Sequence, residues 1–117
     1  MPEDHEQSSR LIAASAVGSV CWCRCCRTFR CLLPETTLRF APTAFFAFRH
    51  VVRQVSSDLY WWIREGKEEP SFVTMRVGAT LLKLSPTELS DLHNLVERVC
   101  AESLLHHPES WPDYLLN

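Results

Sequence analysis

The stretch TTLRFAPTAF at residues 36–45 recurs 44 positions later as TLLKLSPTEL at residues 80–89. Other positions in the two stretches keep similar chemistry, as Arg39 and Lys83 do. A repeat at this spacing predicts that one structural unit occurs twice in the chain. The identical pairs are Thr36/Thr80, Leu38/Leu82, Pro42/Pro86 and Thr43/Thr87.

Each copy predicts a hairpin. The first has strands over residues 28–33 and 36–40, separated at Pro34. The second has strands over 72–77 and 80–84, separated at Gly78. Runs of β-branched and apolar residues that end at proline or glycine are typical of short hairpins.

A helix is expected directly after each hairpin. In the second copy, Ser85 occupies the N-cap, Pro86 the first helical position and Glu88 the third residue after the cap, which is a capping box. In the first copy, Ala41 and Ala44 replace the serine and the glutamate, so this helix depends more on packing. Apolar residues recur every three or four positions in both helices. They are Phe45, Phe48, Val52, Val55 and Leu59 in the first, and Leu89, Leu92, Val96, Val99 and Cys100 in the second.

These elements predict an α+β fold built as a tandem ββα repeat. We expect the two hairpins to join into a four-stranded antiparallel sheet with both helices on one face. Residues 19–107 would form the single domain, with halves at 19–65 and 70–105 joined by the charged stretch REGKEEPS. Residues 1–18 are expected to be a polar, flexible N-terminal tail, and residues 108–117 a C-terminal tail.

Composition points to one domain, because the chain has 117 residues of which 46% are apolar. No apolar run approaches the ~20 residues that a membrane-spanning helix needs. The stretch LIAASAVGSV at residues 11–20 has the length of a signal-peptide core, but three acidic residues and only Arg10 precede it. We therefore expect a cytoplasmic protein whose cysteines are thiols.

Charge is distributed unevenly along the chain. Residues 20–53 hold six arginines against Glu35 alone, whereas residues 54–117 hold ten acidic residues against five basic ones. The two halves can neutralise each other within one chain or between two chains.

Cysteines gather in SVCWCRCCRTFRC at residues 19–31. Cys23 and Cys26 have the spacing of one zinc-ligand pair, with Cys21 as a further ligand. Zinc would need a second pair of ligands. The fold decides whether Cys31, Cys100 or the histidines at 106–107 can reach this site. Zinc binding through Cys21, Cys23 and Cys26 is therefore one hypothesis.

Other interpretations of the cysteines remain open. The pair could be a redox couple, although the strand pattern that follows it supplies no helix dipole to lower a thiol pKa. A thiol nucleophile with a histidine base is a further alternative. The simplest interpretation is a strand in which Cys25 and Cys31 serve as small apolar core residues.

The cysteine pair, the apolar hairpin, the helix and the segment LKLSPTELSDLHNLV resemble a family of small bacterial proteins that is catalogued only as a domain of unknown function. The resemblance covers about residues 21–105. It implies a cytoplasmic protein with no assigned activity, and it supplies no catalytic residues.

Strand alternation predicts a second candidate site. It directs Phe29, Leu38 and Leu82 toward the helices and gathers four cations, Arg30, Arg39, Arg76 and Lys83, on the opposite face of the sheet. Such a face could bind an acidic partner, or it could serve only to keep exposed strands soluble. Nucleic acid is disfavoured, because the net charge is -2 and no base-stacking motif is present.

Aromatic residues form two further groups. Trp61 and Trp62 lie near the end of the first helix, and the C-terminal tail carries Trp111 and Tyr114. Such groups mark a contact surface, with a homodimer as the simplest partner, or they pack back onto the protein. Motifs for phosphate loops, catalytic triads and paired carboxylates are lacking. The sequence thus favours a non-enzymatic binding or adaptor protein, with a zinc-binding domain as the alternative.

Overall fold

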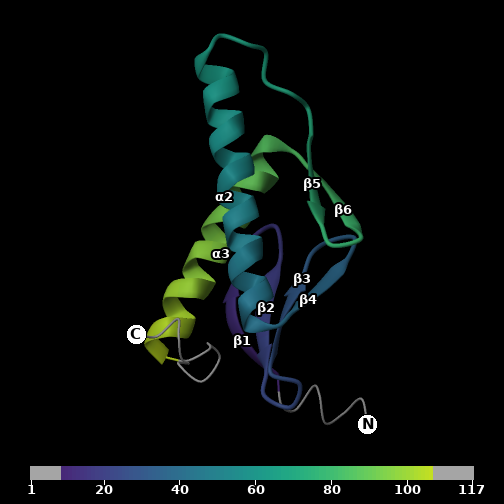
Figure 1. The fold of residues 1–117 in the computed structure, drawn as a ribbon, viewed down its shortest axis with the longest axis vertical. Helices are drawn as coiled ribbons and strands as arrows, with labels where there is room; N and C mark the ends of the chain where they lie inside the picture. Colours follow the sequence, from purple (N-terminus) through teal and green to yellow (C-terminus); the bar gives the residue numbers. More distant parts are fainter. Residues whose placement is uncertain (1–8, 107–117) are drawn as a thin grey trace.

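The computed structural model describes residues 9–106 and shows an α+β fold. A four-stranded antiparallel sheet, a separate two-stranded sheet and two long helices make up this part of the chain (Figure 1). In chain order the elements are β1 (Ser9–Ala14), β2 (Ser19–Cys23), β3 (Thr28–Leu32), β4 (Thr37–Phe40), α2 (Pro42–Arg64), β5 (Val73–Val77), β6 (Thr80–Leu84) and α3 (Pro86–His106). The predicted tail at residues 108–117 lies outside the described residues.

The four-stranded sheet differs from the predicted one. Its strand order is β1-β2-β3-β4, so the two predicted hairpins do not join. Strand β1 lies within the segment assigned to a flexible tail, and it pairs with β2 through a bulge between Leu11 and Ala13. A four-residue turn brings β1 to β2, whereas pairing β4 with the second hairpin would require closing a loop that includes the whole of α2. The shorter closure loses less chain entropy.

The β5–β6 hairpin forms a sheet of its own. Its cross-strand pairs correspond to those of β3–β4 at the 44-residue offset. Phe29 opposite Phe40 matches Val73 opposite Leu84, and Cys31 opposite Leu38 matches Met75 opposite Leu82. The inward-facing residues of both hairpins therefore occupy matching positions.

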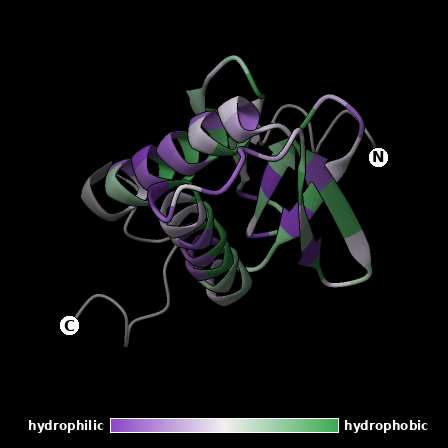
Figure 2. Ribbon diagram, turned by 90° about the horizontal axis from the view of Figure 1, so that it is seen from above, coloured by the Kyte–Doolittle hydropathy of each residue, from purple (hydrophilic) through white to green (hydrophobic). Residues whose placement is uncertain are grey.

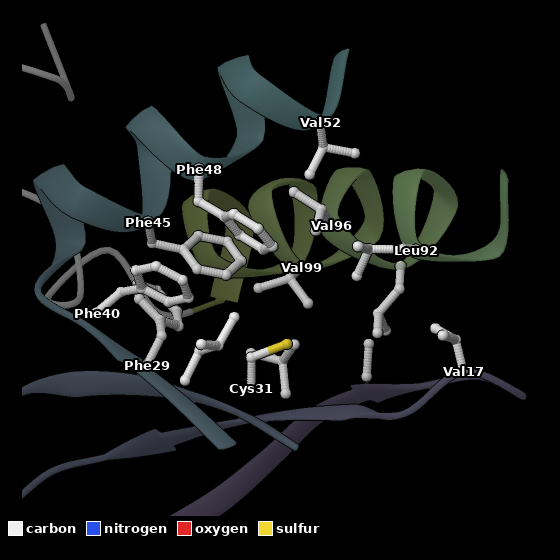
Figure 3. Packing of buried hydrophobic residues seen from close by; sticks show 14 of the residues in the cluster. Val17, Phe29, Cys31, Phe40, Phe45, Phe48, Val52, Leu92, Val96 and Val99 are labelled. Atoms are coloured by element: carbon white, nitrogen blue, oxygen red, sulfur yellow. The ribbon is translucent and has the colours of Figure 1, made fainter. Parts of the chain in front are cut away.

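Both helices lie on the same side of the strands (Figure 2), and the core fills the space between them. Phe45 stacks on Phe29 with ring centroids 4.6 Å apart, and Phe40 stacks on Phe48 at 4.8 Å. Cys31 points into the same core (Figure 3). The predicted inward sets are confirmed for Phe45, Phe48, Val52, Leu89, Leu92, Val96, Val99 and Cys100, which are buried, and Val55 and Leu59 are partly buried.

Glu97 links the two helices. Its carboxylate accepts a hydrogen bond from Arg49 Nε at 2.9 Å and further bonds from Arg53, and His93 Nε2 lies 3.6 Å away. Desolvation opposes ionisation of Glu97, but the hydrogen bonds from Arg53 and Arg49 outweigh it and lower the pKa of this carboxyl group. The helices are therefore held by an ion-pair cluster beside their apolar contact.

The capping box of α3 is confirmed. The backbone N–H of Ser85 donates to Glu88 Oε1 at 2.8 Å, and the N–H of Glu88 donates to Ser85 Oγ at 3.1 Å. The cap of α2, Ala41, has an extended backbone and makes no side-chain cap bond. The start of α3 thus has two side-chain hydrogen bonds of a capping box, whereas the start of α2 has no side-chain cap bond.

Two substitutions test this difference. Ser85→Ala should lower the free energy of unfolding by about 1 kcal/mol, because the N–H of Glu88 loses its acceptor. Ala41→Ser should raise it by up to about 1 kcal/mol, since a serine hydroxyl there can accept from the N–H of Ala44. Urea unfolding measures both changes. A stabilising Ser85→Ala, or a destabilising Ala41→Ser, would contradict the capping assignment.

Candidate functional site

The outer face of the four-stranded sheet brings together residues that the sequence analysis placed in two separate sites. Leu11 lies opposite Cys21, Cys21 opposite Arg30, and Arg30 opposite Arg39, so the four form one row across the sheet. Their neighbours along each strand, such as Val20 and Phe29, point into the core. Strand alternation therefore directs this row away from the helices.

Arg30 and Arg39 form a like-charged pair on adjacent strands. Like charges directly opposite each other in a sheet repel. Nε of Arg30 is also buried without a hydrogen-bond partner among the described residues. Two guanidinium groups in this position can bind a carboxylate or another planar anion.

The other two predicted cations lie on the second sheet. Arg76 of β5 shares a groove with Arg39, whereas Lys83 of β6 lies over the ring of Phe72 at 4.4 Å. Lys83 lines a different hollow together with Glu35 and Glu88. Arg39 therefore lies opposite Arg30 in the sheet and shares the groove with Arg76, whereas Lys83 has acidic neighbours of its own.

The groove beside β4 is a feature that the sequence analysis did not predict. It has a volume of about 480 Å³ and runs between β4, the first half of α2 and the β5–β6 turn. The only signal in the sequence was the shortness of the 36–40 strand, which is common at sheet edges. Its lining residues are Thr37, Leu38, Arg39, Phe40, Ala44, Ala47, Phe48, Val51, Arg76, Val77, Gly78 and Thr80.

The β2–β3 turn carries two of the cysteines, Cys25 and Cys26, and Cys23 is the last residue of the strand before it. The N–H of Cys26 donates to Sγ of Cys23 at 3.4 Å, and the N–H of Arg27 donates to the carbonyl of Cys23 at 2.8 Å. Cys25 was predicted to be a core residue, and this is wrong, because the strand ends at Cys23 and the turn exposes Cys25. Within residues 9–106, no three His, Cys, Asp or Glu side chains group as metal ligands, so Cys21 does not join Cys23 and Cys26.

Neither Cys21 nor Cys26 is activated as a nucleophile. Burial raises the pKa of Cys21, and Arg30 offsets part of that effect. Desolvation and a hydrogen bond with Cys23 raise the pKa of Cys26, against the field of Arg39. A reactive thiol needs a lowered pKa, so the redox and nucleophile alternatives gain no support.

The remaining two cysteines are core residues. Cys31 and Cys100 are buried, and burial raises the pKa of Cys31 to about 12 and that of Cys100 to about 11. The interpretation of Cys31 as a small apolar residue of a strand agrees with this placement. No disulfide joins any of the six cysteines.

Trp61 and Trp62 lie near the C-terminal end of α2, the end of this helix that points away from the four-stranded sheet (Figure 1). Both are about half exposed. Trp62 Nε1 donates to the carbonyl of Glu68 at 2.9 Å, and Lys67 lies 4.3 Å from its ring centre. Trp62 therefore holds the linker after α2. The aromatic group at 111–114 lies outside the described residues.

No family model, curated protein or solved structure matches the chain. The resemblance to a bacterial family of unknown function stays a prediction. Between residues 9 and 106, neither helix is long and apolar enough to cross a membrane.

Proposed function

We propose that the protein is a non-enzymatic binding module that holds an extended, acidic segment of a partner protein along the edge of β4. The observation that carries this proposal is the groove beside β4, which combines an open strand edge with Arg39 and Arg76. Each of these two features has a separate role in binding.

The open edge supplies backbone hydrogen bonds. Strand β4 pairs with β3 on one side, and no described strand pairs with its other side. Exposed edges of this kind are usually shortened or covered, because they recruit other strands. An added peptide strand uses these backbone groups for affinity, and side-chain pockets decide which sequence is accepted.

The groove supplies side-chain recognition. Its floor is apolar, with Phe40, Phe48 and Val77, and it is bordered by Arg39 and Arg76. Alternate residues of an extended peptide point in opposite directions. A segment that alternates apolar and acidic residues can therefore place one set on the floor and the other beside the guanidinium groups.

We also interpret the two ββα units as copies of one ancestral unit. The matching cross-strand pairs and the helix starts at Pro42 and Pro86 support this interpretation. In this interpretation, the second hairpin has become a wall of the groove and does not pair with the four-stranded sheet. Six cysteines without a disulfide are consistent with action in the reducing cytoplasm.

The test uses a short synthetic peptide that alternates valine and glutamate, with its affinity measured by calorimetry. Arg39→Glu and Arg76→Glu should each weaken binding about tenfold or more, since a charge-assisted hydrogen bond contributes about 1.5–3 kcal/mol. Arg10→Glu is the matched control. This substitution makes the same change of charge, but on β1 at the opposite edge of the sheet.

Four outcomes would contradict the proposal. Equal weakening by Arg10→Glu would show only a general charge effect. Undiminished binding of a peptide with methylated backbone nitrogens would exclude strand addition. Displacement of the peptide by a single-stranded oligonucleotide would indicate that the groove binds nucleic acid. A concentration-dependent dimer that blocks peptide binding would indicate that a second copy of the chain occupies the groove.

A further inference from the structure

We propose that Cys23 and Cys26 form a binding site for a soft monovalent metal ion, Cu(I), which the two sulfur atoms coordinate as thiolates. This site is independent of the peptide groove. It is formed by a single turn of the chain, and it needs no residue from a second element as a ligand.

The backbone of the turn brings the two side chains together. The chain reverses so that the N–H of Arg27 donates to the carbonyl of Cys23 at 2.8 Å, and Arg27 itself has a positive φ of 56°. The same reversal directs the N–H of Cys26 at Sγ of Cys23, at 3.4 Å. A backbone N–H that points at a sulfur atom stabilises negative charge there, as a thiolate ligand requires.

The turn that holds the pair is basic, because Arg24 and Arg27 lie within it and are exposed. A Cu(I) ion held by two thiolates carries one net negative charge. Cations around it offset the cost of holding that charge in a partly desolvated place.

The ligand set favours Cu(I) over zinc. Thiolates are soft ligands that select Cu(I), and this ion is stable with two of them, whereas structural zinc requires four ligands. On binding, each thiol releases its proton to solvent and one S–Cu bond forms at each sulfur, with no change in oxidation state. Cys26 is exposed and Cys23 is buried, so the ion enters from solvent at Cys26.

The experiment titrates the full, reduced chain, purified without a metal-affinity tag, with Cu(I) in the absence of oxygen against a coloured Cu(I) chelator. Native mass spectrometry gives the stoichiometry. We expect one copper ion per monomer at substoichiometric chelator. Cys23→Ser and Cys26→Ser should each abolish this binding, whereas Cys25→Ser and Cys21→Ser, one in the same turn and one on the same sheet face, should retain it.

Cys26→Ser carries the most weight, because Cys26 is exposed and its substitution leaves the core intact. Circular dichroism confirms that each variant is folded. Retained binding in Cys26→Ser, or equal loss in Cys25→Ser, would overturn the proposed pair. A dimer that holds one ion between two chains would overturn the two-ligand site and would indicate four thiolates shared by two copies.

Discussion

Phe45→Ala should lower the free energy of unfolding by about 3–5 kcal/mol. The Phe45 side chain is fully buried and points from α2 toward the sheet (Figure 3). Its ring stacks on Phe29 at 4.6 Å and meets the edge of Phe40 at 5.7 Å, and such pairs add to the energy of burial. A domain of this size is stable by only about 5–15 kcal/mol, so the loss is a large share of the total. Urea unfolding, followed by circular dichroism, measures it.

Phe46→Ala is the matched control, because it removes the same ring from the next position of the same helix. Phe46 is 40% exposed, and the guanidinium of Arg49 lies 5.7 Å from its ring centre. We expect this substitution to cost less than about 1 kcal/mol, since much of the ring stays in water. Equal losses for the two variants would mean that the inward face of α2 is assigned wrongly.

Gly18→Ala should cost about 2–3 kcal/mol, although it adds only one carbon atom. A Cβ at position 18 would lie 2.1 Å from the carbonyl oxygen of Leu32, which is backbone and cannot rotate away. Hydrogen bonds also fix the turn at residues 15–18 on the side away from Leu32. The N–H of Ser15 donates to the carbonyl of Gly18 at 2.8 Å, and the N–H of Val17 donates to Asp91 of α3 at 2.7 Å. Relief of the overlap therefore disturbs either the sheet or the contact with α3.

Ala16→Ser is the control for Gly18→Ala, because it also adds one heavy atom to the same turn but at an exposed position. Its effect should stay within about 0.5 kcal/mol. Thermal and urea unfolding measure the change in stability of both variants. If Gly18→Ala is as stable as the original chain, then β2 does not pair with β3 in the register described, in which Ser19 lies opposite Leu32.

The candidate sites were predictable only in part. Residue types singled out the cysteines and the arginines as candidate site residues, but they did not indicate which of these residues would lie next to each other. Cys21 and Arg30 are opposite each other because β2 pairs with β3. Arg76 and Arg39 line the same groove because the β5–β6 turn lies beside β4. These neighbours depend on strand pairing, which no single segment encodes.

Local pattern determined most of the secondary structure. The strands at 28–32, 37–40, 73–77 and 80–84, the starts of both helices at proline, and the inward positions Phe45, Leu89 and Cys31 all follow from alternation, helical spacing and capping within short windows. Burial of apolar side chains enforces such periodicities wherever the segment finally packs. The sequence alone was therefore sufficient to predict these elements and their inward faces.

Tertiary structure alone decided which strands pair. The mixed apolar and small residues of β1 did not mark a strand, yet β1 completes the four-stranded sheet because a short turn brings it beside β2. The β5–β6 hairpin, with the same pattern as β3–β4, packs on the helices without joining that sheet. Pairing depends on loop closure and on the space left beneath α2 and α3, which are properties of the whole chain. The groove beside β4 exists for the same reason.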